Sequence, residues 1–504
     1  MSETEVISTH SITEDLPMSP SDMEPKALSE TSETEIKTGT PEVEEWKKYP
    51  HYCIAVDPDQ DDKATTIKLC SFARPHMRAF HLSWWGFFIA FFIWFAVTPL
   101  LSEIQETLGL TKQEIWTSSI VGVAGTILMS FALGPACDKF GARIPMAVVL
   151  CFAAIPTACT GLVNSATGLA VVRLFIGTAG GTFVMCQFWA SRMFCKEIVG
   201  TANALCGGWG SLGGGVTQLV MGSVLFPIFK SFFDGDASKA WRYVSTVPAV
   251  VAFGTGVMIY YISDDAPKGS YKDLKKHGTM MNVSAAASFR SGAFNLNTWI
   301  LFIQYACCFG VELTMNNAAA LYLKEKFDLK TEQAAAIASI FGFMNIFACG
   351  LGGYMSDKGN SLLGMRGRIA AQTTCLVIEG VLVLVFAQTD SLGAAIAIMV
   401  FFSLFVQAAE GSSFGIVPYI DPPATGAIAG IVGAGGNVGA VCFGLGFRNL
   451  PYKTAFQIMG YSILGSAVLS CVIFIKGQSG LLCGKEGAKD TGVLSVPVGT
   501  RIQQ

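Results

Sequence analysis

Long apolar stretches alternate with short polar stretches along most of the chain. A bilayer core about 30 Å thick is crossed by roughly 20 apolar residues in helical conformation. The chain contains twelve such stretches, near residues 80–101, 115–136, 144–163, 167–190, 200–226, 242–262, 297–320, 332–355, 370–388, 392–418, 425–447 and 454–475. The pattern therefore predicts an all-α membrane protein with twelve transmembrane helices.

The polar segments divide these helices into two sets of six. The expected parts are an N-terminal tail (1–75), a six-helix bundle (76–262), a central loop (263–295), a second six-helix bundle (296–476) and a C-terminal tail (477–504). The acidic, Ser- and Thr-rich N-terminal tail buries too little apolar area to offset its ordering entropy, so it is predicted to be disordered. Basic residues gather in the central loop and in the loops after the second and eighth spans. The positive-inside rule then predicts that both termini are cytoplasmic; the plasma membrane is the expected location.

Composition agrees with a membrane protein and argues against other classes. The chain is 51% apolar and only 14% charged, whereas a soluble domain has about 25% charged residues. A net charge of −3 gives no sign of a nucleic-acid partner. Most cysteines lie in apolar stretches without metal-ligand spacing, and no phosphate-binding loop or nucleophile elbow occurs. We therefore expect no enzyme activity, no metal and no cofactor, with the lipid bilayer as the surroundings.

A Gly-x3-Asp loop with basic residues after it occurs twice, six spans apart. This repeat resembles the loop motif of the major facilitator superfamily. The resemblance implies two related six-helix halves with the substrate at the midplane between them. An Asp in such a loop can cap a helix end and pair with a basic residue, so the motif predicts a cytoplasmic gate. The gating residues expected from it are Gly134, Asp138, Arg143, Asp357 and Arg366.

The fifth and eleventh spans are unusually rich in glycine, with GGWGSLGGGVTQ in one and GIVGAGGNVGAV in the other. Superposing them places Gly210 on Gly436 and Ser211 on Asn437, while Gly213 also has a glycine partner. Each glycine costs a helix about 1 kcal/mol relative to Ala. Either close helix packing or the approach of a ligand to bare backbone would explain the cost. Both explanations remain open, and these five residues are candidates for substrate binding.

The glycine-rich segments, together with SFARPHMRAFHLSW, TFVMCQFW, FGVELTMNN and GMRGR, resemble the nitrate/nitrite porter family, most closely its eukaryotic high-affinity members. The resemblance extends from about Ser71 to Phe474. It implies two bundles that rock to give alternating access, and proton-coupled uptake of nitrate or nitrite. Some relatives need a small accessory subunit, and the sequence leaves open whether this chain does.

Members of this family bind a flat monovalent anion between two arginines, with aromatic rings above and below it. The resemblance assigns the ring positions to Phe183, Tyr305 and Phe309. The two arginine positions are occupied by Ser130 and Cys349. This chain therefore departs from the family pattern at both cationic positions.

An anion without water at the midplane needs opposite charge or several strong donors. Each hydrogen bond to a charged group contributes about 1.5–3 kcal/mol, so losing both arginines should greatly weaken nitrate binding. Three charged residues within the spans, Arg173, Glu312 and Glu410, are candidates for proton coupling. The hypotheses are a proton-coupled nitrate or nitrite importer, a porter of the same fold for a neutral or cationic small solute, and a receptor or regulator that does not transport.

Overall fold

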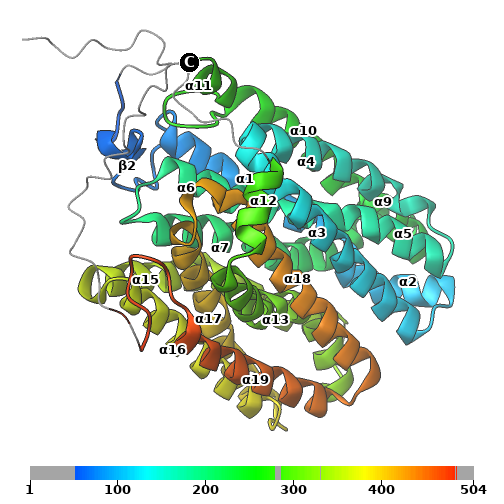
Figure 1. Ribbon diagram of the computed structural model, residues 1–504. Helices are drawn as coiled ribbons and strands as arrows, with labels where there is room; N and C mark the ends of the chain where they lie inside the picture. Colours follow the sequence, from blue (N-terminus) through cyan, green and yellow to red (C-terminus); the bar gives the residue numbers. More distant parts are fainter. Residues whose placement is uncertain (1–50, 278–284, 330, 483, 485–504) are drawn as a thin grey trace, which may run out of the picture. The chain divides into compact units, whose positions relative to one another are not determined.

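The structure, a computed structural model, describes residues 51–277, 285–329, 331–482 and 484 (Figure 1). The predictions for residues 1–50 and for 485–504 lie outside the described residues. Among the described residues, twelve helical stretches are long and apolar enough to cross a membrane. Their number and order confirm the predicted fold class.

Six stretches form the first half of the chain, and four of them change helix type along their length. Their elements are α1 (His76–Trp94) and α2 (Leu101–Leu108), α3 (Lys112–Phe140), α4 (Arg143–Ala158), α5 (Ala166–Gly177) and α6 (Thr182–Met193), α7 (Val199–Thr217) and α8 (Phe226–Phe232), and α9 (Ala237–Val244) with α10 (Thr246–Ile262). A π-helical stretch, Gln218–Leu225, joins α7 to α8.

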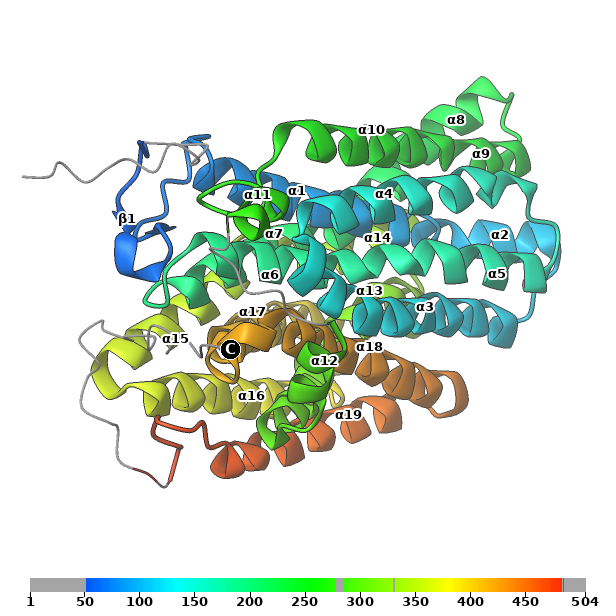
Figure 2. The same ribbon diagram turned by 45° about the horizontal axis from the view of Figure 1, so that its top comes forward.

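The second half repeats this arrangement after a central segment that holds two short helices (Figure 2). The short helices are α11 (Tyr271–Lys276) and α12 (Ala285–Ala293). The spans are α13 (Leu296–Phe327), α14 (Thr331–Phe343) with α15 (Ala348–Leu363), α16 (Met365–Phe386), α17 (Leu392–Ile416), α18 (Thr425–Asn449) and α19 (Tyr452–Val468).

Residues 51–75 are ordered, so the prediction of a disordered tail up to residue 75 is wrong for this segment. Strand β1 (Val56–Asp57) pairs antiparallel with β2 (Lys63–Ala64). The Ala64 carbonyl accepts a hydrogen bond from the Cys195 amide, and the Lys63 ammonium donates to the Ser191 carbonyl at 3.0 Å. These partners lie beyond residue 190, so the composition of the tail alone could not predict them.

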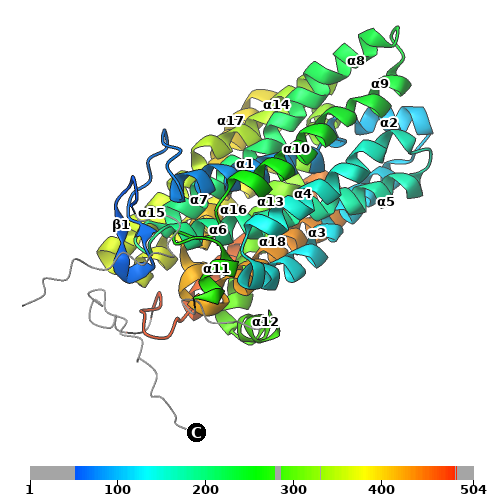
Figure 3. The ribbon, with the colours of Figure 1, turned by 90° about the horizontal axis from the view of Figure 1, so that it is seen from above.

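The two halves pack against each other through small residues. Helix α7 of the first half contacts α15 and α17, and α18 of the second half contacts α3 (Figures 1 and 3). A Cβ atom placed on Gly134 would lie 2.6 Å from the Gly426 carbonyl oxygen, and one on Gly353 would lie 2.5 Å from the Gly200 carbonyl oxygen. Glycine at these positions lets the helix backbones touch, as in many helix contacts within membranes.

Two spans change from α-helix to 3₁₀-helix close to the residues predicted to bind substrate. Thr178–Gly181 forms a 3₁₀ turn directly before α6, which begins one residue before Phe183. Met344–Ile346 forms another between α14 and α15, just before Cys349. Short 3₁₀ stretches inside long helices often mark functional positions. These two interruptions set the directions of the helices that line the centre of the molecule.

Candidate functional site

The three predicted aromatic residues come together in one buried cluster. Phe183 on α6 stacks on Tyr305 and Phe309 of α13, with ring centroids 5.6 and 5.2 Å apart. Tyr305 and Phe309 are themselves 5.2 Å apart. Phe414 of α17 meets Phe183 and Tyr305 edge-on at 5.0 and 5.1 Å. These are direct ring contacts, so a flat solute can lie between Phe183 and the α13 rings only after they separate.

The candidate glycines support the cluster through close packing. A Cβ on Gly210 would lie 1.9 Å from Phe87 of α1, and one on Gly436 would lie 2.4 Å from Phe309. Each glycine thus accommodates an aromatic ring from the first helix of its own half. Gly213 likewise faces backbone of α1, with 2.4 Å from its added Cβ to the nearest carbonyl oxygen. Of the two explanations left open by the sequence, packing accounts for these contacts.

The polar neighbours of these glycines are also buried. Ser211 and Asn437 are each 2% exposed. The Asn437 amide nitrogen donates to the Gly433 carbonyl of its own helix at 3.1 Å. Its amide oxygen has no hydrogen-bond donor within the described residues. Asn437 therefore keeps one acceptor available in the interior, an arrangement that suits a donor on a substrate or a water molecule.

Ser130 and Cys349 are buried where the two halves meet, at 1% and 3% exposure. A Cβ on Gly430 of α18 would lie 2.6 Å from the Ser130 carbonyl oxygen, and one on Gly208 of α7 would lie 2.6 Å from the Cys349 Cβ. Both residues therefore take part in tight contacts between the halves.

The ionisable groups that act most strongly on Tyr305 are carboxyl and thiol groups. They are Glu410, Cys308, Cys349 and Glu312. No guanidinium or ammonium group is among them, so in this part of the described chain the ring cluster has acidic rather than basic surroundings.

Glu312 on α13 and Glu410 on α17 form a carboxyl pair beside the rings. Their exposures are 0% and 4%, and each carboxyl is a hydrogen-bonding neighbour of the other. Asn345 donates to Glu312 Oε1 at 3.0 Å. Glu312 Oε2 and Glu410 Oε1 have no donor among the described side chains. Two neighbouring carboxyl groups in the interior are compatible when they share a proton.

Arg173 lies apart from the ring cluster. Its guanidinium is 4% exposed and donates to the hydroxyls of Ser118 and Ser119 on α3 at 3.0 and 2.8 Å. Arg173 therefore ties α5 to α3 within the first half. It does not replace the arginines that the family has at the positions of Ser130 and Cys349.

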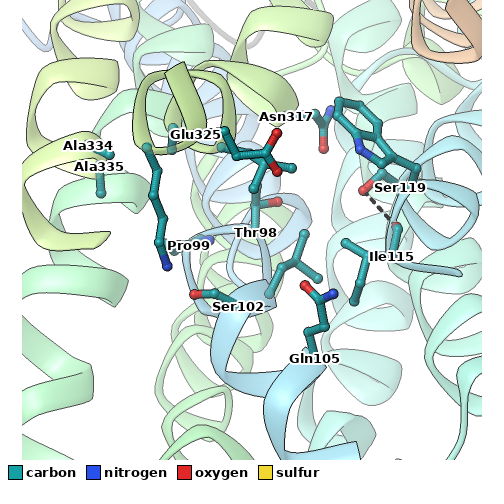
Figure 4. Close-up of a pocket in the computed structure, with 15 residues that line it drawn as sticks. Thr98, Pro99, Ser102, Gln105, Ile115, Ser119, Asn317, Glu325, Ala334 and Ala335 are labelled. Atoms are coloured by element: carbon teal, nitrogen blue, oxygen red, sulfur yellow. Dashed lines mark hydrogen bonds between the residues drawn. The ribbon is translucent and has the colours of Figure 1, made fainter. Parts of the chain in front are cut away.

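A cavity of about 120 Å³ lies between the halves beside α2, at the end opposite β1 (Figure 2). Figure 4 shows Ser102 and Gln105 of the first half on one side of it and Asn317 and Glu325 of α13 on the other. Ser119, which accepts from Arg173, also lines this cavity. The cavity thus brings polar groups from both halves to one end of the molecule.

The opposite end is closed by two aspartates that each cap a helix of the other half. Asp138 of α3 accepts hydrogen bonds from the Gly426 and Ala427 amides at the start of α18, both at 3.1 Å. Asp357 of α15 accepts from the amide and hydroxyl of Thr201 at the start of α7, both at 2.6 Å. A carboxylate at a helix N-terminus satisfies unpaired amides and interacts favourably with the helix dipole.

The basic partners of these aspartates differ from those predicted. Arg368 pairs with Asp357 at 2.6 Å, whereas Arg366 donates to the Gly480 and Gly484 carbonyls. Arg143 lies 3.4 Å from Asp265 in the central segment. Burial raises the pKa of Asp265, and the neighbouring Arg143 opposes that shift.

Sequence reasoning missed several polar residues that the structure places in the interior. Arg368 ends the GMRGR motif, and Asn345 precedes Cys349 by four residues, so both carried a signal. Gln372 and Glu379 are polar residues within the predicted span 370–388. Each polar residue in an otherwise apolar span is a functional candidate, and this rule would have identified them.

Two six-helix halves that meet around a buried central site define a secondary transporter of the major facilitator type. The family model described as Major Facilitator Superfamily matches residues 83–444. The chain therefore belongs to this superfamily, and its relatives place it in the nitrate/nitrite porter family. This is a family of transporters rather than enzymes.

Relatives align along most of their length. The High affinity nitrate transporter 2.5 of Arabidopsis thaliana is 38% identical over 441 residues, covering 87% of this chain and 88% of the relative. The High-affinity nitrate transporter 2.3 of Oryza sativa subsp. japonica is 39% identical over 435 residues, with 85% and 84% covered. The Nitrate/nitrite transporter NrtP of Nostoc punctiforme is 28% identical over 485 residues, with 82% and 95% covered.

Solved structures share the fold at low identity. The proton:xylose symporter XylE bound to 6-bromo-6-deoxy-D-glucose is 14% identical with a TM-score of 0.58, covering 78% of this chain and 94% of that chain. The human organic anion transporter MFSD10 is 13% identical with a TM-score of 0.57, covering 78% and 99%. At this identity they support the fold alone.

Proposed function

We propose that the chain transports nitrate or nitrite together with protons by alternating access of its two halves. The observation that carries this proposal is the juxtaposition of the ring cluster with the Glu312–Glu410 carboxyl pair in one buried region. The rings suit a flat solute, and the carboxyl pair suits a proton. The names of the relatives support nitrate or nitrite as the solute.

The direction of transport follows from the gate and the loop charges. The end closed by Asp138 and Asp357 is the end at which basic loop residues gather. By the positive-inside rule we expect this end to face the cytoplasm and the cavity to lie on the outside, in agreement with cytoplasmic termini. In a plasma membrane, the described conformation is then closed toward the cytoplasm and prepared to receive solute from outside.

Proton coupling has an energetic reason. Moving an anion into a compartment that is negative inside costs roughly 2.3 kcal/mol per charge for each 100 mV. A proton held by the Glu312–Glu410 pair would cross with the anion and offset its charge. The same proton would also remove negative charge next to the binding rings, so proton binding should precede anion binding.

A second candidate function is transport of a neutral or cationic small solute. The observation that favours it is the chemistry around Cys349, at a position where the family has an arginine. Cys349 lies close enough to Glu312 for the two groups to interact electrostatically. A carboxyl pair beside a site without a nearby basic group attracts cations and protons more readily than anions.

Uptake of labelled nitrate and nitrite into a transport-null host distinguishes the two functions. The chain would be expressed as wild type and as the double variant Ser130→Arg, Cys349→Arg. Saturable, proton-driven uptake by the wild type supports the first function. Uptake by the double variant alone, at equal surface expression, contradicts it and supports a changed substrate.

A further inference from the structure

Glu379 is a buried acid that the proposed mechanism does not yet use. It lies in the second half of α16 and is 0% exposed. Neither of its carboxyl oxygens has a hydrogen-bond donor among the described residues. An ionised carboxylate in such surroundings would be very costly, because both its hydration and any compensating donors are missing. The neutral carboxyl, which holds a proton, is strongly favoured.

The ionisable groups that face Glu379 come from three helices. Cys307 and Cys308 of α13, Cys375 of its own helix and Glu410 of α17 interact with it electrostatically. No basic group occurs in this set. From α19, the Gly460 backbone and Leu464 pack against the adjacent residue Gly380.

Within the described residues, no three His, Cys, Asp or Glu side chains are arranged to hold a metal ion. The two unpaired oxygens of the buried Glu379 carboxyl match a proton as the ligand.

Glu379 shares one face of α16 with polar side chains that lie near the gate and near the site. Arg368, Gln372 and Glu379 recur at spacings of four and seven residues and so share one face of α16. Gln372 donates to the Ser413 hydroxyl at 2.7 Å. Ser413 is one turn beyond Glu410 on α17, and Arg368 holds the gate residue Asp357. This face of α16 thus runs from the gate ion pair to the carboxyl groups at the centre.

We propose that Glu379 is a second proton-binding site, electrostatically coupled to the Glu312–Glu410 pair. The inference rests on the proposed proton-coupled function and adds a residue to it. Binding or release of the proton changes one O–H bond and needs no other reactant. Because negative charge on one carboxyl opposes ionisation of the next, the three groups titrate as a coupled set. Loss of the proton from one site therefore makes loss from the other more difficult.

Infrared difference spectroscopy of the full-length protein in liposomes tests the site directly. The carboxyl C=O band of a protonated buried Glu would be followed during a pH titration in the absence of nitrate. Wild type would be compared with Glu379→Gln, with Glu379→Asp, and with Glu106→Gln as an exposed acid on α2. The same preparations would be assayed for proton-driven accumulation of labelled nitrate and for nitrate exchange without a proton gradient.

The expected result is that Glu379→Gln loses one buried-carboxyl component and shifts the titration of the remaining ones. Glu379→Asp should keep a displaced band, and Glu106→Gln should match wild type. Accumulation by Glu379→Gln should fall at least tenfold while exchange persists. An unchanged titration in a folded Glu379→Gln protein would overturn the inference. The spectroscopic result does not require nitrate to be the substrate, so failure of the proposed function is recognised separately by wild-type uptake.

Discussion

Thr201 at the start of α7 donates both its amide and its hydroxyl to the Asp357 carboxylate of α15, each at 2.6 Å. The two residues belong to different halves, so this contact closes one end of the molecule. Asp138 makes the corresponding contact with the start of α18. Two related aspartates thus hold the first turns of the two glycine-rich helices across the boundary between the halves.

Asp357→Asn should open this end. Hydrogen bonds to a charged group are worth about 1.5–3 kcal/mol each, and 1.4 kcal/mol corresponds to a tenfold change in population. We expect the population open at this end to rise at least tenfold, with a smaller rise for Thr201→Val. Distances between spin labels on α7 and α15 would measure it. Among the described residues, Arg366 donates to the Gly480 and Gly484 carbonyls and not to Asp357, so Arg366→Ala should leave the distances unchanged. A rise as large as that of Asp357→Asn would contradict the role of Asp357 in closing this end.

Gly210→Ala and Gly436→Ala should destabilise the protein. Each added methyl would lie 1.9 or 2.4 Å from an aromatic ring, and overpacking costs typically about 1–3 kcal/mol. Gly254→Ala and Gly465→Ala meet nothing within 4 Å and should be neutral or stabilising because alanine favours helix. Thermal unfolding in detergent, followed by size-exclusion chromatography, would compare the four variants. Equal melting temperatures would show that the close contacts are not needed.

Tyr305→Phe tests whether the Tyr305 hydroxyl in the ring cluster donates a hydrogen bond to the solute. The substitution keeps the stack on Phe183 and removes only the hydroxyl. If that hydroxyl donates to a bound anion, the KM for uptake should rise about tenfold, because a hydrogen bond to a charged group contributes about 1.5–3 kcal/mol. The maximal rate should change less. Phe402→Leu, at a buried ring away from the cluster, is the control, and an unchanged KM in Tyr305→Phe would exclude a hydrogen bond from the hydroxyl to the solute.

Cys349→Arg should weaken the pH dependence of transport. A guanidinium at this position would lie beside Glu312 and compete with the proton for the carboxyl pair. We expect initial uptake rates to vary less between acidic and neutral pH than in wild type. Cys349→Ser, which stays small and neutral, should keep the wild-type profile. If both variants retain that profile, the carboxyl pair does not carry the coupling proton.

Lys63 should make the ordered segment 51–75 sensitive to alkaline pH. Burial, aided by Arg192, lowers the pKa of Lys63 from 10.5 to about 8. Between these two values the unfolded chain binds more protons than the native chain, so the free energy of unfolding should rise with pH across this window. Below this pH window Lys63 is charged in both states, so its unfavourable contribution to the free energy of unfolding does not change with pH.

Lys63→Met should raise the melting temperature at neutral pH and flatten the alkaline rise. Thermal unfolding measured at a series of pH values would show both effects, with the exposed Lys68→Met as the control. If the alkaline rise persists in Lys63→Met, it comes from another group.

The sequence predicted the membrane architecture because bilayer crossing imposes a local requirement. A span of about 20 apolar residues satisfies the membrane wherever it occurs in the chain, so the twelve helices and their division into halves could be counted without tertiary information. The ring residues Phe183, Tyr305 and Phe309 were predicted from the family resemblance, because relatives with the same motifs share the same tertiary contacts. The ordered conformation of residues 51–75 could not be predicted from the sequence, because the partners of this segment lie near Phe194, far along the chain.

The roles of single polar residues depended on the tertiary structure. Arg366 and Arg368 are two residues apart, so their side chains point to nearly opposite faces of α16. Only the packing of α16 shows which of these faces meets Asp357, so spacing along the chain could not choose Arg368 over Arg366. Spacing also could not show that Glu312, Glu410 and Glu379 approach one another, since they lie on three different helices. The sequence by itself determined which segments cross the membrane and which family they belong to. Only packing of the helices decided which charges meet, because an electrostatic interaction depends on distance in space rather than along the chain.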